Sequence, residues 1–198
     1  MIITIDGLSF QGKSYICEHL ANRIGFKFFS TGILVRYIAF QYNLMTPNQN
    51  EIETLEKAVS IMETTSVEDI MRCNELRTYD TERALQTVAS HPFAFDRVVN
   101  RIREYGKETN MIMDGRFTYD ILPNAALSYY LLSSLERRAT LVSKSKGISI
   151  DKAIEYINFR DSFERKYTIP SRVKTIFLDD FQNTDEVIDC LERDIRIL

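Results

Sequence analysis

The sequence contains few cysteines and no long apolar run. Its three cysteines, Cys17, Cys73 and Cys190, lack the close spacing of zinc or redox motifs. Any disulfide pairing would leave one thiol over, so a reduced, cytoplasmic protein is the simplest expectation. No apolar run approaches the roughly 18 residues of a bilayer span, and the first residues lack the pattern of a signal peptide. We therefore expect no membrane partner.

The sequence also lacks an excess of positive charge. The net charge is -3 and the pI is near 5.5, so there is no general basic field to hold a nucleic-acid backbone. A small anionic ligand is the better match, and we expect no nucleic-acid partner. The length of 198 residues fits one compact domain with small attached subdomains, and it leaves monomer and dimer open.

Short β-rich runs alternate with helical patterns along most of the chain. Alternation of this kind predicts an α/β fold with a five-stranded parallel sheet between two layers of helices. The first helix is expected from the turn at residues 12–14, and the last from about Thr184, so that both ends of the chain share one core. The expected strands are Ile2–Ile5, Phe26–Phe29, Met111–Met113, Leu127–Leu132 and Val173–Leu178.

A long helical stretch separates the second and third β-rich runs. It extends from about Thr31 to Glu108, with breaks near residues 45–48 and 91–92, and is too long for a simple crossover. Its acidic segment, residues 51–75, keeps helical spacing at Ile52, Leu55, Val59 and Met62. We interpret the stretch as a helical insertion that covers a substrate. A role in packing alone, or in binding a partner through the acidic segment, stays open.

A capping-box pattern at residues 133–136, Ser-Ser-Leu-Glu, predicts a helix after the fourth run. Lys144, Lys146 and Gly147 break this helix before a second one, which extends from about Ser149 to Arg165. Two helices joined by a basic, glycine-containing hinge suggest a lid. The expected organisation is therefore a core of about residues 1–34, 109–142 and 170–198, an acceptor-binding subdomain of about 35–108 and a lid of about 143–169.

A glycine-rich motif follows the first β-rich run. Residues 7–14 read Gly-Leu-Ser-Phe-Gln-Gly-Lys-Ser, which matches the pattern Gly-x-x-x-x-Gly-Lys-[Ser/Thr]. Glycines let backbone N–H groups turn onto phosphate oxygens, and the N-terminus of the next helix adds a favourable dipole. The motif predicts a loop for the phosphates of ATP, in which Lys13 reaches the β- and γ-phosphates and Ser14 holds Mg²⁺. The expected donor-binding residues are Gly7, Ser9, Gln11, Gly12, Lys13, Ser14 and Tyr15.

An Asp-Gly-Arg sequence ends the third β-rich run. In a parallel sheet Asp114 would lie at the carboxyl edge beside the glycine-rich loop, where it would orient magnesium, while Arg116 would face phosphate. Asp-Gly-Arg is otherwise a common turn. Phosphoryl transfer also needs positive groups to neutralise charge, although each candidate is equally suited to a solvated surface. These candidates are Arg36, Arg137, Arg138, Arg160 and Arg165, with Arg137 expected on the donor side.

These motifs together resemble the cytidylate kinase family. The resemblance implies an adenylate-kinase-like P-loop fold, ATP and Mg²⁺ as cofactors, a closing lid, and phosphoryl transfer to CMP or dCMP. It also implies catalytic roles for Lys13, Arg116 and Arg160, an acceptor-phosphate clamp of Arg36, Arg116 and Arg160, and a place for Thr31 at the acceptor. The segments that carry it are residues 3–7 with the loop, Ser30-Thr31-Gly32 followed by Arg36, residues 114–116, and Arg160-Asp161.

The departures from the family pattern lie on the acceptor side. In this chain, Ser30 stands where the family has an aspartate, Val35 where it has a tyrosine, and Phe95 where it has an arginine. Phe117 replaces an aspartate that helps to read cytosine, Glu164 an aspartate near the sugar, and Tyr167 a later arginine. Arg97 or Arg101 would replace the missing arginine if the helix shifts. Loss of polar base-reading groups should change specificity rather than only weaken binding. The expected acceptor-binding residues are Thr31, Arg36, Phe95, Arg97, Arg116, Phe117, Arg160 and Glu164.

Three functional hypotheses follow from the sequence. The first is an ATP- and magnesium-dependent kinase of a nucleoside monophosphate, with CMP or dCMP as the default acceptor. The second is a kinase of another phosphorylated small metabolite or of a modified nucleotide, for which the altered base-reading positions argue. The third is a nucleotide-binding protein that no longer transfers phosphate. The intact loop, Asp114 and Arg116 argue against this third hypothesis.

Overall fold

The computed structural model describes residues 1–45, 50–107, 110–162 and 168–197, and it divides into two compact units. The first, here the sheet unit, comprises Met1–Ser30 and Thr109–Leu198; the second, the helical unit, comprises Thr31–Glu108. Each is described by itself. The predicted roles of residues 35–108 in acceptor binding and of residues 143–169 as a lid stay predictions.

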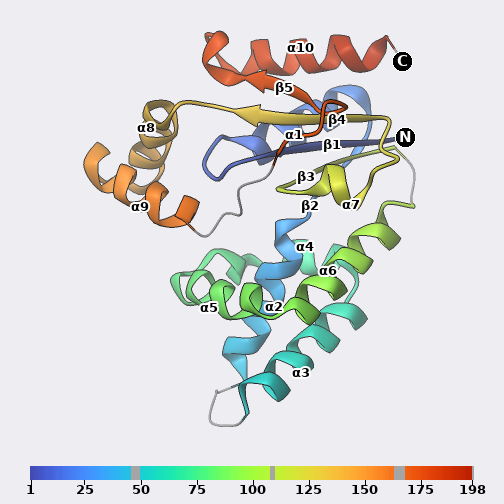
Figure 1. Cartoon of the computed structure of the whole chain (residues 1–198), viewed down its shortest axis with the longest axis vertical. Helices are drawn as coiled ribbons and strands as arrows, with labels where there is room; N and C mark the ends of the chain where they lie inside the picture. Colours follow the sequence, from blue (N-terminus) through green and yellow to red (C-terminus); the bar gives the residue numbers. More distant parts are fainter. Residues whose placement is uncertain (46–49, 108–109, 163–167, 198) are drawn as a thin grey trace. The chain divides into compact units, whose positions relative to one another are not determined.

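The sheet unit contains all the described strands, and Figure 1 shows its elements. Its strands are β1 (Ile2–Gly7), β2 (Lys27–Ser30), β3 (Met111–Gly115), β4 (Leu127–Leu132) and β5 (Lys174–Phe177). Its helices are α1 (Lys13–Ile24), α7 (Thr118–Ile121), α8 (Leu135–Lys146), α9 (Ile150–Ser162) and α10 (Thr184–Arg196), with a short 3₁₀ turn at Leu178–Asp180.

The five strands form one parallel sheet in the order β2-β3-β1-β4-β5. Alternation within β1 assigns its side chains to two faces. Ile3 and Ile5 pack in an apolar core with α1 and α10, while Thr4 and Asp6 hydrogen-bond to Ser128 and Thr118 on the other face. Helix α7 contacts β1 and β3 there. The predicted three-layer α/β fold and all five predicted strands are confirmed, with ends that differ by at most two residues.

The apolar stripes of the first and last helices explain how the two ends of the chain share this core. Ile16 and Leu20 of α1 are buried, and Leu191 and Ile195 of α10 pack in the same cluster. Asn183 caps α10, because its side chain accepts from the Glu186 N–H at 3.0 Å. Both helices begin where the sequence predicted them.

Helices α8 and α9 form a pair joined by Gly147, whose φ of 64° ends α8 in the left-handed region. The predicted N-cap at Ser133 is wrong. The cap is Ser134, whose Oγ accepts from the Arg137 N–H at 3.2 Å. Asp179, from a distant part of the chain, accepts from the Ser134 N–H at 2.8 Å, which is the bond that a glutamate three residues after the cap would make in a capping box. Residues 163–165 of the predicted second helix lie outside the described residues.

The helical unit consists of α2 (Gly32–Leu44), α3 (Glu51–Thr64), α4 (Val67–Arg72), a 3₁₀ turn (Asn74–Arg77), α5 (Tyr79–Ser90) and α6 (Pro92–Tyr105). Leu55, Val59 and Met62 of α3 are buried as predicted, but Ile52 is 51% exposed in the first turn and does not belong to the stripe. The predicted break at residues 91–92 is confirmed, since Pro92 opens α6. Of the break near 45–48, Thr46, Pro47 and Asn48 lie outside the described residues, and α2 ends just before it.

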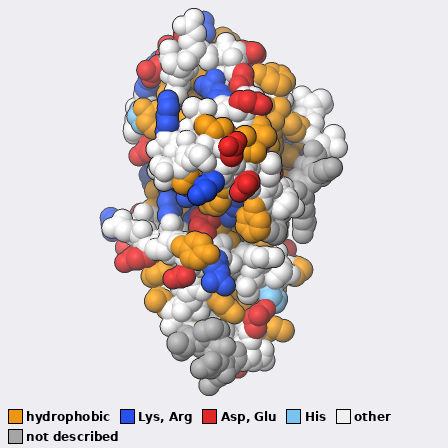
Figure 2. All heavy atoms as spheres, turned by 90° about the vertical axis from the view of Figure 1, so that its left-hand side faces the viewer, with side chains coloured by type: hydrophobic (Ala, Val, Ile, Leu, Met, Phe, Trp, Pro, Cys, Tyr) orange, Lys and Arg blue, Asp and Glu red, His pale blue; other side chains and the backbone are white. Residues whose placement is uncertain are grey.

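None of the described helices is long and apolar enough to cross a membrane. Figure 2 shows basic and acidic side chains interspersed over one face of the molecule, as the small net charge leads one to expect.

A buried carboxylate fixes the segment that follows β3. Asp6 is fully buried and accepts hydrogen bonds from the Thr118 N–H at 2.9 Å, the Thr118 hydroxyl at 2.6 Å and the Tyr119 N–H at 3.0 Å. Burial raises its pKa from 3.8 to about 6, against the lowering effect of these bonds and of Lys13. No role was predicted for Asp6, although an acidic residue within a mainly apolar strand is the signal that marks it.

We expect Asp6 to make stability pH-dependent. Because its pKa is raised on folding, its contribution to the free energy of unfolding falls as the pH rises from about 4 to about 6. The stability of wild type relative to Asp6→Asn should therefore fall by on the order of 3 kcal/mol between about pH 4 and 7 in urea unfolding. Asp179→Asn is the control: the hydrogen bond from Ser134 lowers the pKa of Asp179, so its contribution should stay constant over this range. A pH-independent difference for Asp6→Asn would contradict the assignment.

Candidate functional site

The glycine-rich loop connects the carboxyl end of β1 with the first turn of α1. Its first glycine has a φ of 149°, and a Cβ atom there would lie 2.5 Å from the Leu131 carbonyl oxygen of the neighbouring strand, so Gly7 has no substitute. Gly12 has a φ of 77° and precedes α1 directly, with no atom within 4 Å of a Cβ placed there. The loop thus has the backbone form and the open space that a phosphate group requires at a helix N-terminus.

Lys13 and Ser14 occupy the first turn of α1. The ammonium group of Lys13 donates to the Leu8 carbonyl of its own loop. Ser14 Oγ donates to Asp114 Oδ2 at 2.6 Å, and Asp114 is only 3% exposed at the end of β3. The predicted neighbours Ser14 and Asp114 are therefore in direct contact, although their residues are 100 positions apart.

The contact between Ser14 and Asp114 fits a magnesium site of the kind found in kinases. Mg²⁺ prefers oxygen ligands, and in such sites one or two protein oxygens act together with phosphate oxygens. Within residues 1–45, 50–107, 110–162 and 168–197 there is no cluster of three or more His, Cys, Asp or Glu side chains that could hold a metal ion. A metal ion bound here would depend on phosphate oxygens for its remaining ligands.

Arg116 extends from the end of β3 to the glycine-rich loop. Its Nη2 donates to Ser9 Oγ at 2.6 Å, so the guanidinium lies against the loop, while the role toward phosphate stays a prediction. The position of this segment depends on Asp6, which holds the next helix, α7, by its first two N–H groups. Phe117, at the N-cap of α7, is half-buried.

The two adjacent arginines of α8 have different partners. Arg137 donates through Nη1 to the carbonyls of Leu178 and Phe181, in the segment after β5, with the second bond at 3.2 Å. Arg138 is 6% exposed and donates to both carboxylate oxygens of Asp161 at 2.8 and 3.1 Å. Asp161 is part-exposed at 24%, but loss of its carboxylate would leave the buried Arg138 guanidinium without its partner, which is destabilising. Arg138 is therefore tied to holding α8 against α9.

The remaining candidate residues of the sheet unit lie on α9, in α1 and beyond α9. Arg160 is half-buried in the last turn of α9. Tyr15 is 54% exposed in α1, where its ring stacks on His19 with centroids 3.8 Å apart. Glu164 and Tyr167, which were predicted near the acceptor, and Arg165, which was predicted as a charge-neutralising group, lie outside the described residues.

Arg36 lies on α2 in the helical unit and is paired with a residue that the sequence did not single out. Arg36 Nε donates to Glu82 Oε1 of α5 at 3.1 Å, and Nη1 donates to the Gly32 carbonyl at 3.4 Å. A Cβ atom on Gly32 would come within 3.1 Å of Nη1, so a side chain there would displace the guanidinium slightly. Thr31, the N-cap of α2, is 6% exposed. Glu82 was missed because nothing in the linear order pairs residues 46 apart.

The two candidates on α6 do not behave alike. Phe95 is 45% exposed, so the ring is accessible to a planar ligand rather than part of the core. Arg97 is 58% exposed and pairs with Glu63 of α3 at 3.3 Å. Arg101, the other candidate for the missing family arginine, donates to the Thr65 carbonyl at 2.8 Å. Arg97 thus connects α6 with α3, and Arg101 connects α6 with Thr65, the residue that follows α3.

Two residues of the glycine-rich loop break local rules. Phe10 has a φ of 64°, in the left-handed region that side chains other than glycine rarely adopt, at a cost of about 1–2 kcal/mol. Gln11 is 3% exposed, and among the described residues neither of its amide atoms has a hydrogen-bond partner. The sequence predicted Gln11 as a donor contact but gave Phe10 no role.

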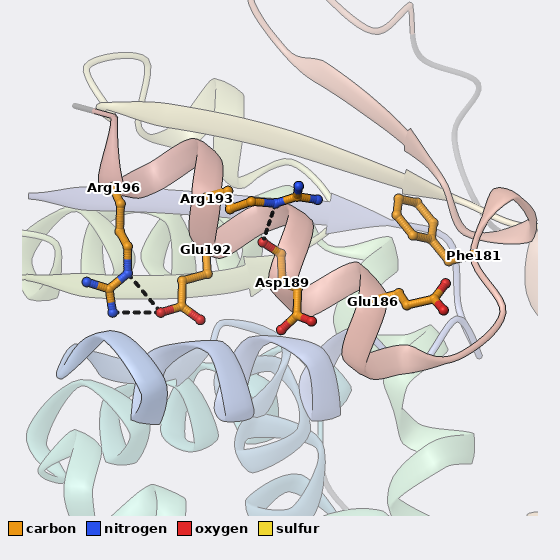
Figure 3. Close-up of a pocket in the computed structure, with 6 residues that line it drawn as sticks. All are labelled: Phe181, Glu186, Asp189, Glu192, Arg193 and Arg196. Atoms are coloured by element: carbon orange, nitrogen blue, oxygen red, sulfur yellow. Dashed lines mark hydrogen bonds and ion pairs between the residues drawn. The ribbon is translucent and has the colours of Figure 1, made fainter.

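A separate surface pocket of about 690 Å³ lies along α10. Figure 3 shows that both of its arginines are engaged within α10: Arg196 donates to the Glu192 carboxylate, and Arg193 to the backbone carbonyl of Asp189. None of its lining residues belongs to the glycine-rich loop or to β3. The loop, with its positive groups and its acidic neighbour Asp114, is the better candidate for chemistry than this surface pocket.

Curated relatives resemble the chain over most of its length. A cytidylate kinase from Roseiflexus castenholzii is 27% identical over 208 residues, which cover 94% of this chain and 90% of the relative. A cytidylate kinase from Listeria monocytogenes serotype 4b (strain CLIP80459) is 31% identical over 147 residues, covering 69% of this chain. That match spans 66% of the Listeria protein, slightly less than two thirds of its length.

A solved structure confirms the fold, and a family model gives the relationship. The shikimate kinase structure from Bacteroides thetaiotaomicron has a TM-score of 0.54 and 11% sequence identity, with 99% of this chain and 98% of that chain covered. At this identity the likeness shows a shared P-loop kinase fold. The model of the family described as cytidylate kinase matches residues 3–175, and the chain therefore belongs to the cytidylate kinase family.

Proposed function

We propose that the protein is an ATP- and magnesium-dependent kinase that transfers a phosphoryl group to a nucleoside monophosphate, with CMP or dCMP as the leading acceptor. The observation that carries the proposal is the 2.6 Å contact between Ser14 and Asp114 beside Lys13, in a chain of the cytidylate kinase family. This arrangement supports phosphoryl transfer because positioning and charge neutralisation supply most of its catalysis.

The residues of the sheet unit divide the work on the donor. When bound, ATP supplies the phosphoryl group and Mg²⁺ neutralises its charge. Lys13 would exchange its bond to the Leu8 carbonyl for one to phosphate oxygens, and the backbone from Gly7 to Gly12 would hold the phosphate chain. Ser14 and Asp114 would hold the metal ion, while Arg116, already against the loop at Ser9, would neutralise charge on the transferring group.

In this proposal the residues of the helical unit bind the acceptor. Glu82 holds Nε of Arg36 and the Gly32 carbonyl accepts from Nη1, so that the guanidinium has a set orientation toward the acceptor's phosphate. The acceptor's phosphate oxygen is ionised at neutral pH, so the proposal requires no general base.

A kinase of another phosphorylated metabolite is the second candidate. It is favoured by the residues where the family reads cytosine: Phe117 replaces an aspartate, and the exposed Phe95 replaces an arginine. Arg97, the substitute for that arginine, is paired with Glu63 at 3.3 Å. A protein that binds nucleotide without transferring phosphate is disfavoured by the intact contact between Ser14 and Asp114.

A scan of acceptors tests the function. Purified protein with ATP and Mg²⁺ is incubated with CMP, dCMP, UMP, AMP, GMP, dTMP and non-nucleotide phosphates, and ADP release is measured. We expect turnover with CMP or dCMP, and a loss of at least about 100-fold in Lys13→Ala because a positive group at the transferring phosphoryl is removed. Lys57→Ala, a change of the same kind in α3 of the helical unit, is the control. Turnover with another acceptor alone would establish the second candidate, and none with any acceptor would refute the kinase.

The magnesium assignment predicts a separate effect. Asp114→Asn and Ser14→Ala should each raise the Mg²⁺ concentration for half-maximal turnover by about tenfold or more, because each removes an oxygen ligand or its orienting partner. Asp120→Asn, which changes an exposed carboxylate on α7, is the matched control. Activity at saturating Mg²⁺ should recover more in Ser14→Ala than in Asp114→Asn, since the carboxylate carries the charge. An unchanged Mg²⁺ requirement would refute the assignment.

Arg36 should affect the acceptor and not the donor. Arg36→Lys keeps the charge but loses the planar fork, so the KM for the acceptor should rise by about tenfold or more while the KM for ATP stays within about twofold. Glu82→Gln should raise the acceptor KM to a smaller extent, because an amide still accepts from Nε. Arg72→Lys, at the exposed ion pair with Asp69 on α4 of the same unit, serves as the control. A change in the ATP KM alone would contradict the assignment of Arg36.

A further inference from the structure

The glycine-rich loop carries a phenylalanine where its backbone favours glycine. The φ of Phe10 is 64°, so the loop would be less strained with glycine at this position. A strained residue persists when its surroundings determine its conformation, and such residues gather at functional sites. The surroundings of the Phe10 side chain therefore determine this backbone conformation.

The Phe10 ring packs against helix α9. Its centroid lies 5.3 Å from that of Tyr156, with the ring planes inclined at 43°, a normal geometry for an attractive aromatic pair. Both rings border the apolar cluster that joins α8 to α9, formed by Ala139, Val142, Ala153 and Ile157. Phe10 is thus the point where the loop meets the helix pair.

The pair formed by α8 and α9 is internally well connected. Besides the apolar cluster, Nη1 of Arg138 donates to both carboxylate oxygens of Asp161, an ion pair that joins the two helices. Lys146, at the end of α8, lies 4.9 Å above the Tyr156 ring of α9. A contact at Tyr156 therefore acts on the whole pair and not on one side chain alone.

Tyr156 and Arg160 are four residues apart on α9. At this spacing two side chains lie on the same side of a helix, one turn apart. Because Tyr156 contacts Phe10, the side of α9 that carries Tyr156 and Arg160 faces the loop. Arg160 is the arginine of α9 that the family resemblance places at the reacting phosphates.

We propose that Phe10 is a positioning residue that couples the phosphate-binding loop to α9 through Tyr156 and so sets the position of Arg160 for phosphoryl transfer. The inference rests on the proposed kinase function for the role of Arg160, and its structural half, the coupling of loop and helix, does not. The strain at Phe10 is retained because glycine there would leave α9 without its contact to the loop. Phe10 and Tyr156 touch no substrate in this proposal.

The kinetic test is a double-mutant cycle. Phe10→Gly removes the ring and the strain together, and Tyr156→Ala removes the partner without altering the loop. Each should lower kcat about three- to tenfold with the KM for ATP changed less than about twofold, because the backbone groups that hold the phosphates remain. The double variant should be no slower than the slower single one. Multiplying losses, or a raised ATP KM with unchanged kcat, would overturn the proposal.

Two controls separate this effect from a loss of stability. Tyr156→Phe keeps the ring and should retain wild-type kcat. Leu141→Ala removes an exposed apolar side chain of α8 away from the aromatic pair and should leave kcat unchanged. Phe10→Gly is compatible with the loop backbone and should unfold at or above the wild-type temperature, which distinguishes it from a misfolded variant. A fall in kcat in Leu141→Ala as large as in Tyr156→Ala would also overturn the proposal.

Hydrogen exchange tests the coupling without turnover. A non-hydrolysable ATP analogue with Mg²⁺ should slow amide exchange in both the loop and residues 150–162 of wild type. In Phe10→Gly and Tyr156→Ala the slowing should be confined to the loop. If wild type turns over no acceptor but shows this pattern, the proposed function fails and the coupling stands. Equal protection of α9 in all variants would overturn the coupling whatever the acceptor assay shows.

Discussion

The central position of β1 determines where the chemistry of the sheet unit lies. β1 has a parallel neighbour on each side, β3 and β4, and its last residue, Gly7, passes so close to Leu131 of β4 that a Cβ atom would overlap the carbonyl oxygen. The chain has to leave the sheet there through a residue without a side chain. Because parallel strands end at the same edge, the loop that follows meets the end of β3, and Ser14 meets Asp114.

Asp6 extends the same constraint to the other face of β1. The residue next to Gly7 uses its buried carboxylate to hold the first N–H groups of α7, which positions the segment with Arg116. The cost of burying Asp6, visible in its raised pKa, is offset by three hydrogen bonds that leave α7 little freedom. The end of β1 thus positions two features: Gly7 leads into the glycine-rich loop, and Asp6 holds the segment that carries Arg116. The two meet where Arg116 donates a hydrogen bond to Ser9 of the loop.

Periodicity and motif spacing predicted the strands, the helices that bear the core and the contact of Ser14 with Asp114, because alternation, glycine positions and parallel strand ends are local or topological rules. These rules gave wrong predictions where residues distant in the sequence determine the local structure. Ser134 became the cap of α8 because Asp179 arrives from after β5, and Ile52 left its stripe because the first turn of α3 is exposed. Arg138 had the same appearance in the sequence as Arg137, and only the fold buries it and gives it Asp161 as a partner.

The glycine-rich loop contains the two residues that agree least with local rules. Phe10 adopts a left-handed backbone that costs about 1–2 kcal/mol, and the buried amide of Gln11, without a partner among the described residues, costs about 1–3 kcal/mol. Two neighbouring costs of this size are a large part of the stability of a single domain. Violations of local rules gather at functional sites. The contact of the Phe10 ring with the Tyr156 ring on α9 offsets part of the cost of the Phe10 backbone conformation. The conformation of the loop and the position of α9 therefore depend on each other.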